Sequence, residues 1–156
     1  MSRFRRDDAP SLVRAARQDA SLTQAELAGM TGMSQSTLAQ IESGKRVVSA
    51  ELLERILRAA DYRPSVPLAR YASSISGYAQ ERGLGFLRVF GSVARGTDGF
   101  DSDIDLIGTP TRDLSLFELA DIASFTSELT GFPTEVHVDT HVPERLQIAV
   151  DEAVAL

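Results

Sequence analysis

The chain contains no cysteine, so it can form neither a disulfide nor a thiolate zinc site. It also lacks any apolar run near the ~18 residues that a membrane-spanning helix requires. The basic start, residues 1–6, is followed by no apolar segment of the kind that a secretory signal needs. Hydrophobic residues make up 43% of the chain and charged residues 24%, as in a globular protein. We therefore expect a cytoplasmic protein without a membrane partner.

Positive charge is scarce and lies mostly in the first part of the chain. Residues 1–66 hold 10 Lys or Arg and 8 Asp or Glu, a balance of +2, whereas residues 67–156 hold 6 and 14, a balance of −8. This asymmetry predicts two modules with different partners. The first module could approach nucleic acid, and the second would repel bare phosphate unless cations intervene.

Two prolines, Pro64 and Pro67, mark a boundary between the modules, because proline stops a helix and stiffens a short connection. Upstream, apolar residues recur at helical spacing in residues 11–17, 23–30, 34–42 and 49–60. Downstream, the pattern predicts helices over 67–82, 114–130 and 143–155, and strands over 84–90, 102–108 and 134–140. We expect an all-α domain over residues 1–63, a linker over 64–67, and an α/β (α+β) domain with a small mixed sheet over 68–156.

Residues 22–46 contain two short helices joined by a turn at Gly32, a residue that can adopt positive φ. Thr23 and Glu26 form a capping-box pattern at the start of the first helix, and Ser34 can cap the second. Apolar residues anchor the second helix to the core and leave its polar residues, Gln35, Ser36 and Gln40, on the outward face. A glutamine on such a face can contact adenine through two hydrogen bonds, worth ~1–3 kcal/mol of discrimination.

This pattern over residues 10–60 resembles the helix-turn-helix of phage repressors and the wider XRE family. The resemblance implies that Gln24, Gln35 and Gln40 face double-stranded operator DNA. Lys45 and Arg46 follow the recognition helix and are candidate phosphate contacts, as Gln24 is at the start of the preceding helix. Because a bundle this small binds DNA weakly alone, we expect a dimer on a two-fold site. A protein-interaction role is the alternative.

The second module contains a glycine-serine turn, Gly91-Ser92, and then Asp103 and Asp105. Residues two apart on a strand share a face, so the two carboxylates would converge and, with a nucleotide triphosphate, offer oxygen ligands to Mg²⁺. Gly91 would allow a phosphate to approach the backbone closely. Ser92 could donate its hydroxyl to that phosphate, and Arg95 could add a charged donor.

This string resembles the polymerase-β-type nucleotidyltransferases, and above all their minimal, MNT-type members, whose signature is Gly-Ser, ten residues and Asp-x-Asp. Here residues 93–102 supply those ten. The resemblance covers residues 67–156 and implies ATP as substrate, two Mg²⁺ ions and a third carboxylate on a neighbouring strand. Counting from Gly131 places that carboxylate on Glu135, where the family usually has aspartate. Asp139 is the alternative, and His137 lies between them as a possible neighbour of the site.

Minimal members of this size resemble the antitoxins paired with HEPN-type RNase toxins, which transfer AMP to a tyrosine of the toxin. We therefore expect an antitoxin that adenylylates a HEPN-type toxin and represses its own operon, as a homodimer or a hetero-oligomer with the toxin. Two alternatives remain open. One is a toxin-type enzyme that adds nucleotides to tRNA, against which the acidic second module argues. The other is a transcriptional regulator without catalytic activity, against which the intact Gly-Ser and Asp-x-Asp argue.

Overall fold

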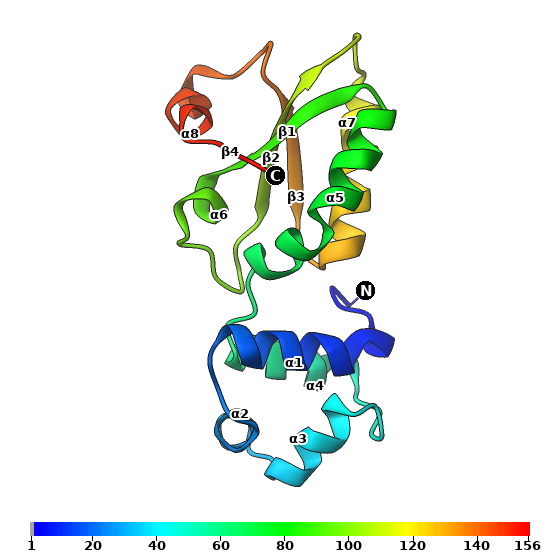
Figure 1. The fold of residues 1–156 in the computed structure, drawn as a ribbon, viewed down its shortest axis with the longest axis vertical. Coiled ribbons are helices and arrows are strands. Elements are labelled where there is room, and N and C mark those ends of the chain that lie inside the picture. Colours follow the sequence, from blue (N-terminus) through cyan, green and yellow to red (C-terminus); the bar gives the residue numbers. More distant parts are fainter. Residues whose placement is uncertain (1) are drawn as a thin grey trace.

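The N-terminal part of the molecule is a helical bundle. The structure is a computed structural model that describes residues 2–156. A short 3₁₀ turn, η1 (Arg6–Asp8), leads into α1 (Ala9–Asp19), α2 (Gln24–Thr31), α3 (Gln35–Glu42) and α4 (Ala50–Ala59). Figure 1 shows α1 and α4 facing the C-terminal part of the molecule, with α2 and α3 at the far end. The helical assignment made from the sequence is therefore confirmed for this part of the chain.

Side-chain caps determine where these helices begin. Thr23 accepts a hydrogen bond from the Glu26 backbone N–H and the Glu26 carboxylate accepts one from the Thr23 backbone N–H, which completes the predicted capping box. Ser34 caps α3 in the same way through the backbone N–H of Thr37. Gly32 ends α2 in the left-handed region with φ of +71°. The turn between the two helices thus has the chemistry that its residues predict.

The connection between the two parts is shorter than the linker predicted over residues 64–67. Helix α5 (Ser65–Glu81) begins within that segment, with Pro64 at its N-cap and Pro67 in its first turn. Proline is tolerated there because the first N–H groups of a helix have no intrahelical partner. The prolines therefore start a helix where the sequence suggested a spacer.

The C-terminal part is built on a mixed sheet of four strands, in the order β3-β2-β1-β4. Strand β1 (Leu84–Phe90) pairs antiparallel with β2 (Ile104–Pro110) and with β4 (Val154–Ala155), while β3 (Thr134–Val138) runs parallel to β2. Helix α6 (Gly91–Arg95) follows β1 directly, and α7 (Leu116–Thr130) connects β2 to β3. This arrangement confirms the α/β fold with a small mixed sheet.

Helices cover both faces of this sheet in Figure 1, with α5 and α7 on one side and α6 and α8 (Gln147–Asp151) on the other. Ile104 and Leu106 are fully buried on the α5–α7 side. A smaller apolar cluster of Phe90, Ile107 and Val150 lies on the other side, beneath α8. The face that carries Asp105 is therefore covered only in part.

The last segment of the chain differs from the single helix predicted over residues 143–155. It forms a 3₁₀ turn, η2 (Glu144–Leu146), then α8, and then the edge strand β4. Val154 and Ala155 pair with Val89 and Arg88, and the Leu156 N–H donates to the Leu87 carbonyl at 3.1 Å. Pairing with the open edge of β1 satisfies backbone N–H and C=O groups of that edge. The spacing of apolar residues within one segment carries no information about such a distant partner. No helix within residues 2–156 is long and apolar enough to span a bilayer.

Candidate active site and nucleic-acid face

The candidate active site begins at the turn between β1 and α6. Gly91 has φ of +71°, and a Cβ atom at this position would collide with the Asp105 carboxylate. From the sequence, Gly91 is expected to allow a close approach by phosphate. In the structure the space beside its Cα is taken by Asp105, so the glycine is required to place the carboxylate against the turn.

Asp103 and Asp105 lie where β2 begins. Asp105 is the second residue of β2 and is half-buried, opposite Phe90 of β1, whereas Asp103 is exposed and precedes the strand by one residue. The predicted strand over 102–108 thus starts two residues late, at Ile104. Asp103 and Asp105 still flank the fully buried Ile104, which fixes this short stretch of backbone to the core.

Glu135 lies beside Asp105 across the parallel pair of strands. The two residues are direct register partners, and the next residues on the same face, Ile107 and His137, are partners as well. The His137 Nε2 atom is 3.5 Å from a Glu135 carboxylate oxygen, and its ring lies 5.7 Å from the Phe90 ring. Glu135 and His137 therefore border the same patch of sheet as Asp105.

Asp139, the alternative third carboxylate, has other partners. It follows the end of β3, where its backbone N–H donates to the Gly108 carbonyl at 3.0 Å. Its carboxylate accepts hydrogen bonds from Thr109 and from Arg88, the latter at 3.3 Å. These contacts fix Asp139 to the far end of β2, while Glu135 is paired with Asp105 itself. The geometry thus favours Glu135 over Asp139.

Ser92 and Arg95 lie on α6, immediately after the glycine turn. The helix contains only five residues, Gly91–Arg95, and ends at Gly96 in the left-handed region with φ of +68°. Ser92 is half-buried in its first turn, and Arg95 is exposed in its last. A triphosphate bound at this turn would meet the hydroxyl, the first N–H groups of the helix and a guanidinium.

Electrostatic repulsion is concentrated at Asp105. Burial raises the pKa of this carboxyl, and the charges of Asp103 and Glu135 raise it further, against the opposing effects of His137 and Arg95. The three carboxylates thus form a site with excess negative charge, which a cation would relieve. Within residues 2–156, however, no three Asp, Glu or His side chains gather closely enough to hold a metal ion unaided. The donor set fits Mg²⁺, which is commonly held by one or two carboxylates together with substrate phosphates.

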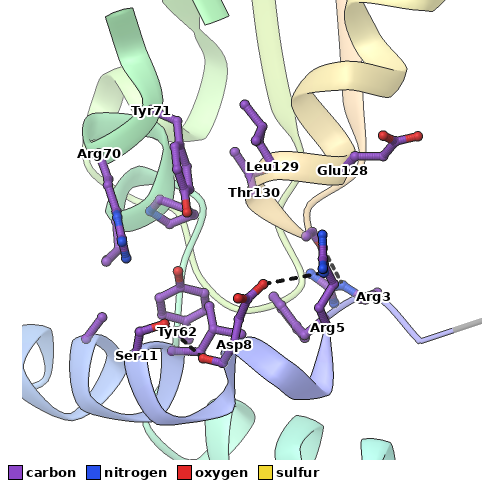
Figure 2. Close-up of a pocket in the computed structure, with 16 residues that line it drawn as sticks. Arg3, Arg5, Asp8, Ser11, Tyr62, Arg70, Tyr71, Glu128, Leu129 and Thr130 are labelled. Carbon is purple, nitrogen blue, oxygen red and sulfur yellow. Dashed lines mark hydrogen bonds and ion pairs between the residues drawn. The ribbon is translucent and has the colours of Figure 1, made fainter. Parts of the chain in front are cut away.

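A cavity lies elsewhere, between the helical bundle and the C-terminal part (Figure 2). Its accessible volume is about 50 Å³, and its walls come from α1, α5, the end of α7 and the N-terminal segment. In Figure 2 the hydroxyl groups of Tyr62 and Tyr71 point toward one another across it. It includes none of the three acidic residues and is therefore separate from the candidate active site.

Helix α3, which the sequence predicts to be the recognition helix, exposes the residues singled out there for DNA. Gln35, Ser36 and Gln40 are exposed on α3, while Leu38 and Ile41 are fully buried beneath it. Lys45 and Arg46 are exposed in the turn that follows, where both of their backbone N–H groups donate to the Gln40 carbonyl. Figure 1 places this surface at the opposite end of the molecule from the sheet.

Gln24 is held in place by neighbours on both sides. Its amide nitrogen donates to the Glu42 carboxylate at 3.0 Å, and its amide oxygen accepts from Gln35 at 2.8 Å. Glu42 is only 3% exposed and is also bonded by Arg17. Gln24 thus links the start of the recognition helix to a buried ion pair, a relationship that its position in the sequence did not predict.

Two residues outside the predicted set, Arg3 and Asp61, contact the backbone beside the candidate site. They hydrogen-bond to the backbone segments that precede Asp103 and Glu135. Asp61 has φ of +48°, a conformation that Asp, Asn and Gly tolerate best. Asp61 directly follows the helix predicted over residues 49–60, and an aspartate at a helix end is compatible with a positive φ. No pattern in the sequence pointed to Arg3.

Comparison with protein-family models identifies both parts of the molecule. Residues 13–66 match a helix-turn-helix model, and residues 73–156 match the model of a nucleotidyltransferase domain. A comparison with curated proteins found no match. The second match spans more than half of the 156 residues and includes the glycine turn, all three acidic residues and all four strands. The chain therefore belongs to the nucleotidyltransferase domain family, and it carries a helix-turn-helix domain fused in front of that domain.

Proposed function

We propose that this protein is a DNA-binding antitoxin that transfers AMP from ATP to a hydroxyl group of a partner toxin and represses its own operon. The observation that carries the proposal is the placement of its two functional surfaces. The recognition helix lies on the far side of the helical bundle, away from the sheet that carries the three carboxylates. Bound DNA would therefore leave the acidic residues open to a second macromolecule.

The chemistry follows from the side chains around the glycine turn. A hydroxyl of the acceptor attacks the α-phosphorus of the nucleotide in line, a P–O bond forms, and the bond to pyrophosphate breaks. Glu135 accepts the hydroxyl proton, which its exposed position beside Asp105 allows. Ser92 and Arg95 hold the leaving phosphates and offset the charge that develops on them.

Asp103 and Asp105, with Glu135 as their neighbour, are the residues that would hold Mg²⁺ together with the phosphate oxygens. A bound Mg²⁺ supplies Lewis-acid polarisation of the phosphate and neutralises the excess negative charge of the three carboxylates. Asp105 sits against Gly91, so the charge that it contributes lies directly at the phosphate turn.

A macromolecular acceptor fits the exposure of the site. Asp103 and Glu135 are both exposed, so a hydroxyl group on the surface of a second macromolecule could reach them. The balance of −8 over residues 67–156 opposes an RNA acceptor. A tyrosine of a HEPN-type toxin is the acceptor that the resemblance to minimal nucleotidyltransferases implies.

The DNA-binding half of the proposal rests on α3 and the following turn. Glutamines on an exposed helix offer paired donors and acceptors to adenine, and Lys45 and Arg46 offer charge to phosphates. The net charge of the first 66 residues is only +2, so one copy would bind DNA weakly. Two copies on a two-fold operator would combine their contacts, and we therefore propose a homodimer on DNA.

Incubation of the purified protein with α-³²P-labelled ATP, Mg²⁺ and a cell lysate tests this function. The proposal expects a labelled protein band, and the toxin encoded by the neighbouring gene should account for it. A labelled tRNA band would favour a toxin-type enzyme instead. Operator binding without any label would identify a regulator that does not catalyse transfer. Either of these two results would contradict the proposed adenylylation.

A further inference from the structure

The loop that leads into Asp103 is fastened to the helix-turn-helix domain and its junction. The Phe100 backbone N–H donates to the Asp61 carboxylate at 2.9 Å, and the Ser65 N–H donates to the Asp98 carboxylate at 2.8 Å. Asp98 is only 6% exposed and the Phe100 side chain only 3%, so these contacts lie inside the molecule. A side chain on Gly99 would press against Asp61, since a Cβ there would lie 3.3 Å from its oxygen.

The N-terminal segment grips the same loop and also the start of β3. The Arg3 guanidinium donates to the Phe100 carbonyl at 3.1 Å and to the Gly131 carbonyl at 3.2 Å. Its central carbon, Cζ, also lies 4.8 Å from the ring centres of both Phe100 and Phe132. Phe4 packs against Gly131 so closely that a Cβ there would lie 2.5 Å from its ring. One arginine thus joins two loops that are 31 residues apart in the sequence.

These two loops are the ones that set the positions of the acidic residues. Phe100 precedes Asp103 by three residues, and Gly131 precedes Glu135 by four. The Ile104 N–H donates to the Pro133 carbonyl at 2.8 Å, which starts the ladder that pairs Asp105 with Glu135. A shift of either loop would therefore change the distance between the Asp105 and Glu135 carboxylates, which lie where β2 and β3 begin to pair.

We propose that Arg3 and Asp61 are positioning residues of the active site, through which the helix-turn-helix domain sets the spacing of Asp103, Asp105 and Glu135. The inference rests on the site assigned above but on neither the acceptor nor the toxin. It makes the helix-turn-helix domain part of the catalytic machinery in addition to its role on DNA. Residues that hold metal ligands in place, without touching the metal themselves, commonly weaken metal binding about 10- to 100-fold when they are removed.

Two substitutions at Asp61 separate positioning from folding. Asp61→Asn and Asp61→Gly both suit a φ of +48°, but only asparagine retains an oxygen that can accept the Phe100 N–H. Arg3→Ala removes both carbonyl contacts, and Arg5→Ala is its matched control, because Arg5 is exposed and contacts only Asp8 among the ion pairs described for it. Thermal unfolding of each variant identifies the temperature at which all of them are folded.

The measurement is binding of Mn²⁺·ATP by water-proton relaxation at that temperature, with hydrogen exchange at the Phe100 amide as a second reading. Asp61→Gly and Arg3→Ala should bind about 10-fold more weakly or worse, with Phe100 deprotected in Asp61→Gly. Asp61→Asn and Arg5→Ala should stay within about twofold of the unmodified protein.

Equal binding by Asp61→Gly and Asp61→Asn would overturn the inference, as would unchanged binding by Arg3→Ala. If the unmodified protein failed to bind Mn²⁺·ATP, the site assignment and the inference would both be wrong. If Mn²⁺·ATP bound normally and yet no protein became labelled, only the proposed adenylylation would fail.

Discussion

Asp105 is held in a costly position, half-buried and within the field of two other carboxylates, with its side chain against a turn that only glycine can make. A protein whose sole requirement was stability would gain by replacing it with a neutral residue. The unfavourable burial of this charge is explained if the Asp105 carboxylate binds a cation together with a triphosphate. A substitution at Gly91 can test this role of Asp105, because it would displace the carboxylate without removing it.

Gly91→Ala should impair the site more than the matched change Gly96→Ala. Both glycines have positive φ, +71° and +68°, so alanine costs about 1 kcal/mol of backbone strain at either position. At Gly96 nothing lies within 4 Å of the new Cβ, whereas at Gly91 the Cβ would collide with the Asp105 carboxylate. We expect Gly91→Ala alone to weaken Mn²⁺·ATP binding, by at least about 10-fold.

Isothermal titration of both variants, with thermal unfolding as the control, measures the difference. If the two alanines reduced nucleotide binding to the same extent, backbone strain would explain the result, and the close approach of Asp105 to the turn would have no role.

Glu42 should make the helix-turn-helix domain sensitive to acid. Burial opposes its ionisation, but hydrogen bonds from Arg17 and Gln24 outweigh burial and lower its pKa below the usual 4.5. Because the folded pKa is the lower one, the stabilisation is complete above about pH 4.5 and is lost as pH falls through the folded pKa. Glu42→Gln should reduce the free energy of unfolding at pH 7 by about 1.5–3 kcal/mol.

Urea unfolding between pH 7 and pH 3 measures this effect. The stabilities of Glu42→Gln and the unmodified protein should converge toward the acid end, while the exposed control Glu152→Gln should follow the unmodified protein throughout. A constant difference between Glu42→Gln and the unmodified protein would show that the ionisation of Glu42 contributes nothing.

At the scale of the element, α3 is the part of the molecule that we expect to read DNA. Gln35→Ala should weaken binding to the promoter of the protein's own operon by about 1–3 kcal/mol and relax preference at one base pair. Gln18→Ala is a matched control, because Gln18 is an exposed glutamine on α1, outside the recognition helix. Fluorescence anisotropy at fixed salt, with single-base variants of the duplex, measures both effects.

Equal losses of DNA affinity for Gln35→Ala and Gln18→Ala would contradict the assignment of α3 as the helix that reads DNA.

Lys45→Ala should instead weaken binding to all DNA sequences alike and lower the salt dependence of binding, since a phosphate contact carries no sequence information.

Elements whose partners are close in sequence were predictable. The caps at Thr23 and Ser34, the end of α7 at Gly131 and the turn at Gly91 all follow from local chemistry. The final segment was not predictable, because strand β4 exists only where β1 has an edge to offer. The choice between Glu135 and Asp139 depended likewise on the register of β3 against β2, which no single segment contains.

At the scale of the whole molecule, the two domains share one core. Phe4 packs edge-on against Tyr62 and Phe132, with ring centres 5.9 and 5.7 Å apart, and it also contacts Phe100. Apart from the small cluster beneath α8, the buried apolar residues of both parts form one continuous cluster. The charge asymmetry of the sequence indicated two modules, and it could not show that an N-terminal aromatic residue joins them.

Phe4→Ala should destabilise the molecule as a unit, by about 3–5 kcal/mol. Because the core is continuous, hydrogen-exchange protection in α3 and in β1 should be lost at the same urea concentration in the unmodified protein. In Phe4→Ala both transitions should move to a lower urea concentration together, because the other residues of the shared core still link the two domains. Separate transitions in the unmodified protein would contradict a shared core.

The double substitution Asp103→Asn with Asp105→Asn tests whether these two carboxylates support nucleotidyl transfer. Transfer of α-³²P label from ATP to the proposed toxin partner is measured for the unmodified and substituted proteins, with circular dichroism and binding to the proposed operator as controls for folding. We predict that label transfer disappears while the helical signal and DNA binding persist. Label transfer that survives the double substitution would show that the catalytic site lies elsewhere.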